Sequence, residues 1–156
     1  MTRSPQPQSP AIHWILLRHA HRDTVEPRKD NGLSEKGLVQ AQETATQIAP
    51  LLRRSRAPVR ILTSPKARCL ETVTPIGLAM AVRVEVEPRL AEQRDDEDSR
   101  AMLRRLRELV KELEARAAGY QLVLCSHGDV LPLLTEMLTG RSESLKKGEW
   151  LSVSES

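Results

Sequence analysis

The stretch W-I-L-L-R-H-A-H-R-D, residues 14–23, decides the fold of this chain. Four apolar residues run directly into Arg18 and His19, after which the chain becomes polar. A short unbroken apolar run of this kind predicts a strand buried on both faces, and in an open α/β sheet ligands bind beyond the carboxyl ends of such strands. We therefore expect Arg18 and His19 to lie at the lip of a binding crevice.

Length and composition limit the kind of protein to which that crevice can belong. The chain has 156 residues, which is enough for one domain with a sizeable core. A domain of this size does not need a metal ion or a disulfide to stabilise it. The chain contains no Phe, one Tyr and two Trp, so the core must be aliphatic. The formal net charge is only +3, with both signs interleaved. With so few aromatic side chains to stack on bases, the composition argues against nucleic-acid binding.

The ends of the chain and its cysteines bear on where the protein works. Residues 1–10 are rich in proline and lack large apolar residues after Met1, which predicts a disordered tail ahead of a single domain over 11–156. Neither a secretory signal pattern nor an apolar run of membrane-spanning length is found, so we expect a cytoplasmic protein with no membrane partner. Cys69 and Cys125 lack C-x-x-C partners and are expected to be reduced, inert packing residues.

Short apolar segments predict the other strands. Residues 59–63 and 122–125 are apolar runs, residues 82–87 alternate apolar and charged side chains as an edge or half-exposed strand does, and residues 149–153 suit a last strand. Helical patterns separate these segments. The alternation predicts an α/β fold of three layers (α/β/α), with a mainly parallel central sheet covered by helices on both faces.

The first two helices have clear start signals. Ser34 is the expected N-cap of the first, whose apolar side includes Leu38 and which Pro50 should end early or kink. Ser64 should cap the second helix, with Pro65 at its first position.

Two more helices follow. The third should run from the end of the acidic segment at 98 to about residue 118, ended by Gly119, with a solvated face of Arg, Lys and Glu. The fourth should cover 130–138 and be closed by Gly140.

Three polar segments follow predicted buried strands directly and hold the candidate chemistry: Arg18-His19, S-P-K-A-R at 64–68, and S-H-G at 126–128. Because parallel strands bring their carboxyl ends to one edge, two histidines and two arginines distant in sequence should converge there. Guanidinium groups bind phosphoryl oxygens in pairs, and amides at helix starts add donors. A histidine in such a site can attack phosphorus through an unprotonated ring nitrogen and form a phosphohistidine that water hydrolyses.

These motifs resemble those of the histidine phosphatase superfamily, which includes the cofactor-dependent phosphoglycerate mutases. The R-H-A motif is similar to the family's R-H-G, with Ala20 in place of glycine. Three further segments match in family order: L-S-E-K-G-L-V-Q-A at 33–41, S-P-K-A-R at 64–68 and S-H-G at 126–128. The resemblance spans about residues 12–153 and implies a phosphoglycerate mutase-like fold.

The resemblance also implies a role for each motif residue. His19 would be the nucleophile, and Arg18, Arg68 and His127 would complete the phosphate pocket, with His127 also catalytic. Glu92, in L-A-E, matches the L-x-E of many members, which use this glutamate as general acid.

Alternatives stay open for several residues near these motifs. His21 and Arg22 are candidates to line the pocket, although a solvated loop position suits His21 equally well. Glu92 begins an acidic run and could instead be a surface residue. Asp129 is a weaker candidate for the general acid and otherwise would cap the following helix.

The sequence therefore predicts a hydrolase, a histidine-type acid phosphatase that cleaves phosphomonoesters through a phosphohistidine on His19. Glu92 favours an ester substrate, because an alkoxide leaving group needs a proton at the transition state. No cofactor is expected, and no metal, since the sequence holds no H-E-x-x-H, paired cysteine ligands or Asp-rich loop.

Two other functions remain. One is a protein phosphohistidine phosphatase with the same nucleophile, because the chain resembles the small bacterial members in length. The other is a phosphate-binding or interaction module without turnover, for which Ala20 is the hint. The short chain leaves few residues for a lid, so we expect an open pocket that takes a phosphorylated small molecule, a nucleotide-related phosphate or a phosphoprotein. The oligomeric state is not predicted.

Overall fold

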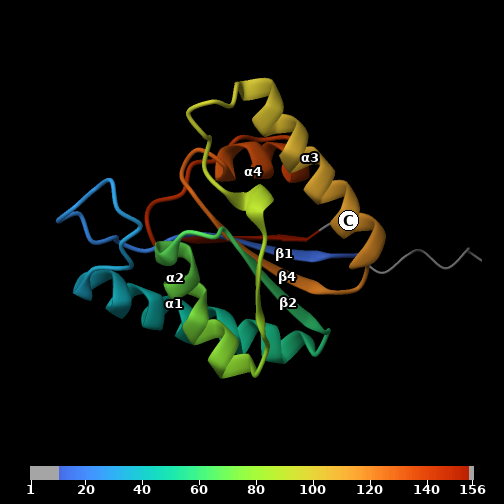
Figure 1. Ribbon diagram of the computed structural model, residues 1–156. Coiled ribbons are helices and arrows are strands. Elements are labelled where there is room, and N and C mark those ends of the chain that lie inside the picture. Colours follow the sequence, from blue (N-terminus) through green and yellow to red (C-terminus); the bar gives the residue numbers. More distant parts are fainter. Residues whose placement is uncertain (1–10, 155–156) are drawn as a thin grey trace, which may run out of the picture.

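Strands and helices alternate along the chain in a computed structural model that describes residues 11–154 (Figure 1). The tail expected at 1–10 lies outside the described residues. The elements are β1 (His13–Arg18), α1 (Glu35–Ser55), β2 (Val59–Thr63), α2 (Ala67–Met80), β3 (Val84–Val86), the 3₁₀ turn η1 (Pro88–Leu90), α3 (Ser99–Arg116), β4 (Gln121–Ser126), α4 (Leu131–Thr139) and β5 (Trp150–Ser154).

One sheet of five strands forms the middle layer, in the order β3-β2-β4-β1-β5. The first four strands of the chain are parallel, and β5 pairs antiparallel with β1. In this register Arg18 lies opposite Ser126, and Thr63 lies opposite Cys125. The carboxyl ends of β1, β2 and β4 therefore meet at one edge, which confirms the predicted α/β fold and the expected convergence of the three polar segments.

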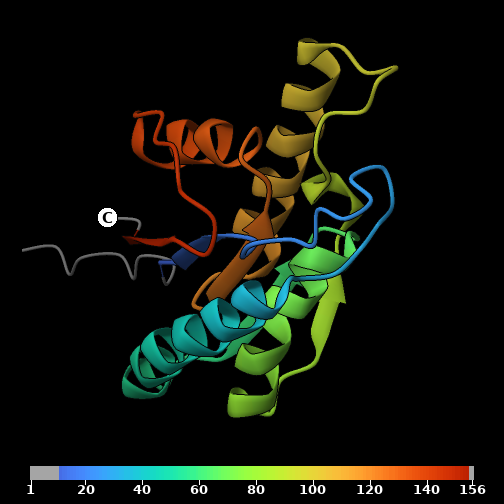
Figure 2. The same ribbon diagram turned by 90° about the vertical axis from the view of Figure 1, so that its left-hand side faces the viewer.

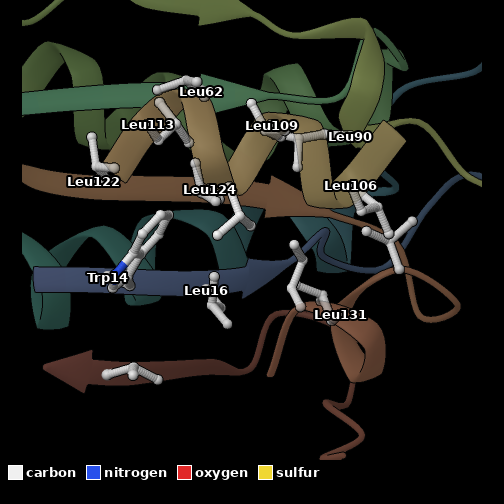
Figure 3. Packing of buried hydrophobic residues seen from close by; sticks show 14 of the residues in the cluster. Trp14, Leu16, Leu62, Leu90, Leu106, Leu109, Leu113, Leu122, Leu124 and Leu131 are labelled. Carbon is white, nitrogen blue, oxygen red and sulfur yellow. The ribbon is translucent and has the colours of Figure 1, made fainter. Parts of the chain in front are cut away.

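Two helices cover each face of the sheet (Figures 1 and 2). Helices α1 and α2 pack on the face that presents Ile15, Leu17 and Val123. Helices α3 and α4 pack on the other face, where Trp14 and leucines of β1, β2 and β4 meet leucines of both helices (Figure 3). Each such aliphatic side chain contributes about 1.5–3 kcal/mol on full burial, and apart from Trp14 the fully buried large side chains are aliphatic, as expected from composition.

Helix α1 begins as predicted but runs further. The hydroxyl oxygen of Ser34 accepts a hydrogen bond from the Gly37 amide, which confirms the N-cap. The helix does not end early at Pro50, as one of the two expectations for this proline had it, because it continues to Ser55. Leu52, beyond the proline, is buried against the sheet, and this burial compensates for the helical hydrogen bond that proline cannot donate. Leu38 was also misplaced, since 49% of it is exposed.

Helix α2 starts later than predicted, at Ala67, and Ser64 is not its cap. The Lys66 side chain makes no cap hydrogen bond either. Instead, the carboxylate of Asp30 accepts from the Ala67 amide at 2.9 Å, so the loop after β1 caps this helix. Ser64 is thereby free for another role.

The remaining boundaries lie close to the predicted ones. The strand expected at 82–87 is reduced to three residues at the edge of the sheet. Helix α3 ends at Arg116, so Gly119 belongs to the turn that follows, with φ of +84°. Gly140 closes α4 in the left-handed conformation, as predicted. None of the helices in residues 11–154 is long and apolar enough to cross a membrane.

Candidate active site

Arg18 is the last residue of β1, and its guanidinium is fixed beyond the end of the sheet. Its Nη1 donates to the Leu145 carbonyl at 2.9 Å. The group lies over Gly128, where a Cβ atom would come within 2.8 Å of the arginine Cζ. Gly128 therefore leaves the space that the guanidinium occupies.

His19 follows directly and is 5% exposed. Its Nδ1 lies 2.8 Å from the Ala20 carbonyl oxygen, and because a carbonyl only accepts, Nδ1 carries the proton. Burial, together with the positive charges of His127, Arg68 and Arg18, lowers the pKa of His19 from 6.5 to about 4. The imidazole is therefore neutral at pH 7, with its lone pair on Nε2.

His127 follows β4, and its two ring nitrogens have different partners. The Ser64 hydroxyl lies 2.8 Å from Nε2, and Nη2 of Arg68 lies 3.4 Å from Nδ1. A guanidinium can only donate, so in the neutral ring Nδ1 accepts and Nε2 donates to the serine, whereas the protonated ring carries the charge that acts on His19 and Glu92. The ring of His127 stands edge-on to that of His19, with centroids 5.5 Å apart.

Glu92 comes from the segment between η1 and α3. Its Oε1 accepts from Nη2 of Arg68 at 3.0 Å, and its Oε2 lies 3.9 Å from Nδ1 of His127. Burial by itself would raise the pKa of Glu92, but the nearby charges of His127 and Arg68 outweigh that effect and hold the pKa below its usual value. Glu92 is therefore an ionised part of the site rather than a remote surface residue.

These side chains share an open cavity of about 440 Å³ at the edge predicted from the strand ends. Its lining comprises Arg18, His19, Arg22, Arg68, Glu92, His127, Gly128, Asp129, Ser144, Leu145 and Lys147. Two histidines and a carboxylate thus surround a space bordered by guanidinium groups, which suits an anionic substrate.

A comparison with protein-family models agrees with the resemblance seen in the sequence motifs. The model for the histidine phosphatase superfamily (branch 1) matches residues 14–96. The chain belongs to the histidine phosphatase superfamily. This membership supports a phosphatase function. No curated protein sequence matches the chain.

Solved structures share the fold of this histidine phosphatase. Phosphoglycerate mutase from Bacillus anthracis superposes with a TM-score of 0.77 at 16% identity, covering 94% of this chain and 88% of that one. The mycobacterial glucosyl-3-phosphoglycerate phosphatase has a TM-score of 0.70 at 21% identity, with 90% of each chain covered. The Agrobacterium tumefaciens protein assigned as the phosphohistidine phosphatase SixA has a TM-score of 0.69 at 20% identity, covering 92% and 90%. At these identities the likeness shows the fold alone.

Ala20, where the histidine phosphatase motif has glycine, fits without strain. It is fully buried in a small cluster with Leu33 and Ala41. Its amide donates to the Thr72 hydroxyl at 3.0 Å, and its carbonyl accepts from His19. The extra methyl group therefore packs, and the backbone contacts that orient His19 are made with alanine in place.

Of the two less certain candidates, Arg22 lines the cavity and His21 does not. Nδ1 of His21 lies 2.7 Å from the Ser34 hydroxyl, and the side chain is not among those that line the cavity. The structure thus joins His21 to the start of α1. Arg22 does line the cavity, although its Nη2 donates to the carbonyls of Pro27 and Lys29.

Asp129 also lines the cavity, but it does not cap α4 as expected. Its Oδ2 accepts from the Gln93 amide at 3.0 Å, in the residue after Glu92. The residue preceding α4 is Val130, which has no side-chain cap.

Sequence reasoning missed several contributors. Ser64 was assigned to a helix start, and Thr72 was not singled out, although both contact the motif residues. Leu145 and Lys147 lie in the loop before β5, which no motif marks. The antiparallel pairing of β5 with β1 and the hydrogen bonds from the Gly148 amide to the Arg18 and His19 carbonyls bring that loop to the site.

Cys69 lies next to His127. Its thiol is fully buried and lies 3.7 Å from Nε2 of His127. Burial alone would raise the pKa of Cys69, but hydrogen bonds from Cys125 and His127 and the charges nearby lower it to about 6. Burial raises the pKa of Cys125. Both thiols are free, as expected.

Proposed function

We propose that this protein hydrolyses phosphomonoesters through a covalent phosphohistidine on His19, without a metal ion. The state of His19 is the observation that supports this most strongly. The Ala20 carbonyl fixes the proton on Nδ1, and the low pKa keeps Nε2 unprotonated in a cavity bordered by arginines. A buried, neutral imidazole in that tautomer is ready to act as a nucleophile.

Arg18 and Arg68 would bind the phosphoryl group. Within residues 11–154, Nη2 of Arg18 and Nη1 of Arg68 make no hydrogen bond, and the Nε atoms of both are buried without a partner. Unpaired donors of this kind cost about 1–3 kcal/mol each when buried. Phosphoryl oxygens supply the missing acceptors, and guanidinium pairs match their geometry.

The chemistry follows in two steps. Nε2 of His19 attacks phosphorus while the bond from phosphorus to the ester oxygen breaks, and Glu92 gives its proton to the departing alkoxide. A water molecule then attacks the phosphohistidine, Glu92 takes the proton of that water, and the P–N bond breaks to release phosphate and restore His19.

Glu92 must be protonated before the first step, although its pKa is low in the free site. The bound phosphate dianion provides the reason for a change. It brings negative charge beside Glu92 and draws on the same Arg68 donors that stabilise the carboxylate. Both effects raise the pKa of Glu92 in the complex.

Arg68 holds Glu92 beside the phosphate pocket, where its carboxyl group can give a proton to a leaving group. This favours an ester over phosphohistidine as substrate, because an alkoxide leaving group needs that proton and an imidazole leaving group needs far less help from an acid. The test compares wild type with Glu92→Gln, which keeps the acceptor for Arg68 and loses the proton. Release of phosphate is measured with a chelator present, from an alkyl phosphomonoester and from a phosphohistidine peptide. His19→Asn is the control for background hydrolysis.

We expect turnover of the ester despite the chelator and a loss of at least about 10²-fold in Glu92→Gln, the low end of what a general acid contributes. Hydrolysis of the phosphohistidine peptide alone, with little effect of Glu92→Gln, would identify a phosphohistidine phosphatase instead. Binding of phosphate without turnover of either substrate would identify a binding module.

A further inference from the structure

We propose that Asp129 and Arg105 are positioning residues that hold Glu92 against the leaving group of the substrate. The inference rests on the proposed function, because it assigns how that reaction's acid is kept in place. It also gives Asp129 a role other than that of an alternative acid.

Glu92 needs to be held because its own segment has no regular structure. Residues 91–98 connect η1 to α3 without forming a helix or a strand (Figure 1). The side chain of Glu92 is 41% exposed, and the segment carries four more carboxylates before α3 begins. Local propensity and burial therefore do not determine where Glu92 points.

Arg105, on α3, binds this segment at two residues, Glu97 and Glu92, and binds η1 at a third, Arg89. Its Nε and Nη2 donate to the two oxygens of Glu97 at 2.8 and 2.9 Å, in a bidentate pair whose side chains are 11% and 5% exposed. Its Nη1 donates to the Arg89 carbonyl at 2.6 Å, and Nη2 also reaches the Glu92 carbonyl at 3.2 Å. The hydrogen bonds from Arg105 lower the pKa of Glu97 to about 2, so the pair stays ionised above about that pH.

Asp129 binds the segment from the other side. Its Oδ2 accepts from the Gln93 amide at 3.0 Å, and it stands three residues after the end of β4. Ser126, the last residue of β4, donates from its hydroxyl to the Leu90 carbonyl at 2.6 Å. The backbone on both sides of Glu92 is thus tied to the strand end that also presents His127.

The contacts of Asp129 and Glu92 indicate different roles, positioning for Asp129 and proton transfer for Glu92. The Oδ2 atom of Asp129 is already used by a backbone amide, while Glu92 contacts both Arg68 and His127 directly. Asparagine can accept the same amide hydrogen through its Oδ1, but it cannot act as an acid. Alanine can do neither.

The experiment uses two substrates that differ in leaving group, an alkyl phosphate and a nitrophenyl phosphate. A nitrophenolate departs with little help, so only the alkyl ester depends on a well-placed acid. Rates of phosphoenzyme formation are measured for wild type, Asp129→Ala, Asp129→Asn, Arg105→Met and Arg105→Lys. Arg104→Met, at the exposed neighbouring position on α3, is the matched control.

We expect Asp129→Ala and Arg105→Met to slow phosphorylation by the alkyl phosphate at least about tenfold, a fraction of the general-acid effect. Phosphorylation by the nitrophenyl phosphate should stay within about threefold of wild type. Asp129→Asn should keep the rate of phosphorylation by the alkyl phosphate near that of wild type. Arg105→Lys should not, because lysine lacks the planar guanidinium that binds both oxygens of Glu97. Arg104→Met should change neither rate.

Three results would overturn the proposal. An effect of Asp129→Asn as large as that of Asp129→Ala would make Asp129 an acid or an electrostatic group. Equal slowing of both substrates by Asp129→Ala would indicate damage to the phosphate pocket. Normal rates in Asp129→Ala would show that the contact with Gln93 does not matter. The Asp129 comparison remains decisive if the Arg105 variants fail to fold, and absence of phosphoenzyme in wild type would show that the proposed function itself had failed.

Discussion

Gly128 offers the sharpest test of how Arg18 is held. Alanine at this position would place its Cβ 2.8 Å from Cζ and 3.0 Å from Nη2 of Arg18. Ordinary contact between carbon atoms begins at about 3.5 Å, so the guanidinium must move by roughly 0.7 Å, the difference between 3.5 and 2.8 Å. Gly128 has no positive φ, so the substitution strains no backbone and acts through this contact alone.

The cost follows from the displacement. A misplacement of about 1 Å in a reacting group can lower a rate by about 10²-fold, which corresponds to about 2.7 kcal/mol of transition-state free energy. We therefore expect Gly128→Ala to reduce kcat/KM for a phosphomonoester by that order. The free energy of unfolding should change by no more than about 1 kcal/mol, because alanine also restricts the unfolded chain.

The assay is a double-mutant cycle with Arg18→Lys, measured as kcat/KM together with urea unfolding. A lysine chain lacks the planar group that lies over Gly128, so adding Gly128→Ala to Arg18→Lys should cost little further activity. The reasoning is refuted if Gly128→Ala alone keeps kcat/KM within about threefold of wild type, or if it costs as much in the lysine background.

Three further outcomes are expected. Ala20→Gly should lower the free energy of unfolding by about 1 kcal/mol through loss of a buried methyl group, with kcat/KM unchanged, and a drop in activity would count against the packing role given to Ala20. In an NMR titration the imidazole of His19 should stay neutral, with its proton on Nδ1, until the pH falls to about 4, because the folded-state pKa lies below 6.5; protonation near pH 6.5 would contradict the burial argument. Ser64→Ala should cost about 1–3 kcal/mol in urea unfolding and lower kcat, because it leaves the buried Nε2 of His127 with only the weak sulfur acceptor of Cys69; unchanged stability would remove Ser64 from the site.

Much of the fold could be predicted from the sequence because its strongest signals are local. The apolar run before Arg18 and the runs before Ser64 and Ser126 are buried strands, and their shared direction brought the motif residues to one edge, as expected. Helix α1 continues past Pro50 because Leu52 is buried against the rest of the protein. The rule that proline ends a helix considers only neighbouring residues and does not include this burial.

The rest of the site depends on partners far apart in the sequence. Ser64 resembles a helix cap locally, and its bond to His127 spans 63 positions. Asp129 was expected to cap a helix, yet its acceptor oxygen is used by an amide 36 positions away. Such pairings become visible only when the sheet register and the loop before β5 are known.

Covalent chemistry on His19 is the central claim, and trapping the phosphoenzyme tests it most directly. Wild type and His19→Asn are mixed with a radiolabelled phosphomonoester in the presence of a chelator, quenched in base, and the attached phosphate is then tested for acid lability and located by peptide mapping. We predict an acid-labile, base-stable phosphate on the peptide that contains His19 in wild type and none in His19→Asn. Turnover without such an intermediate, or label on another residue, would contradict the account.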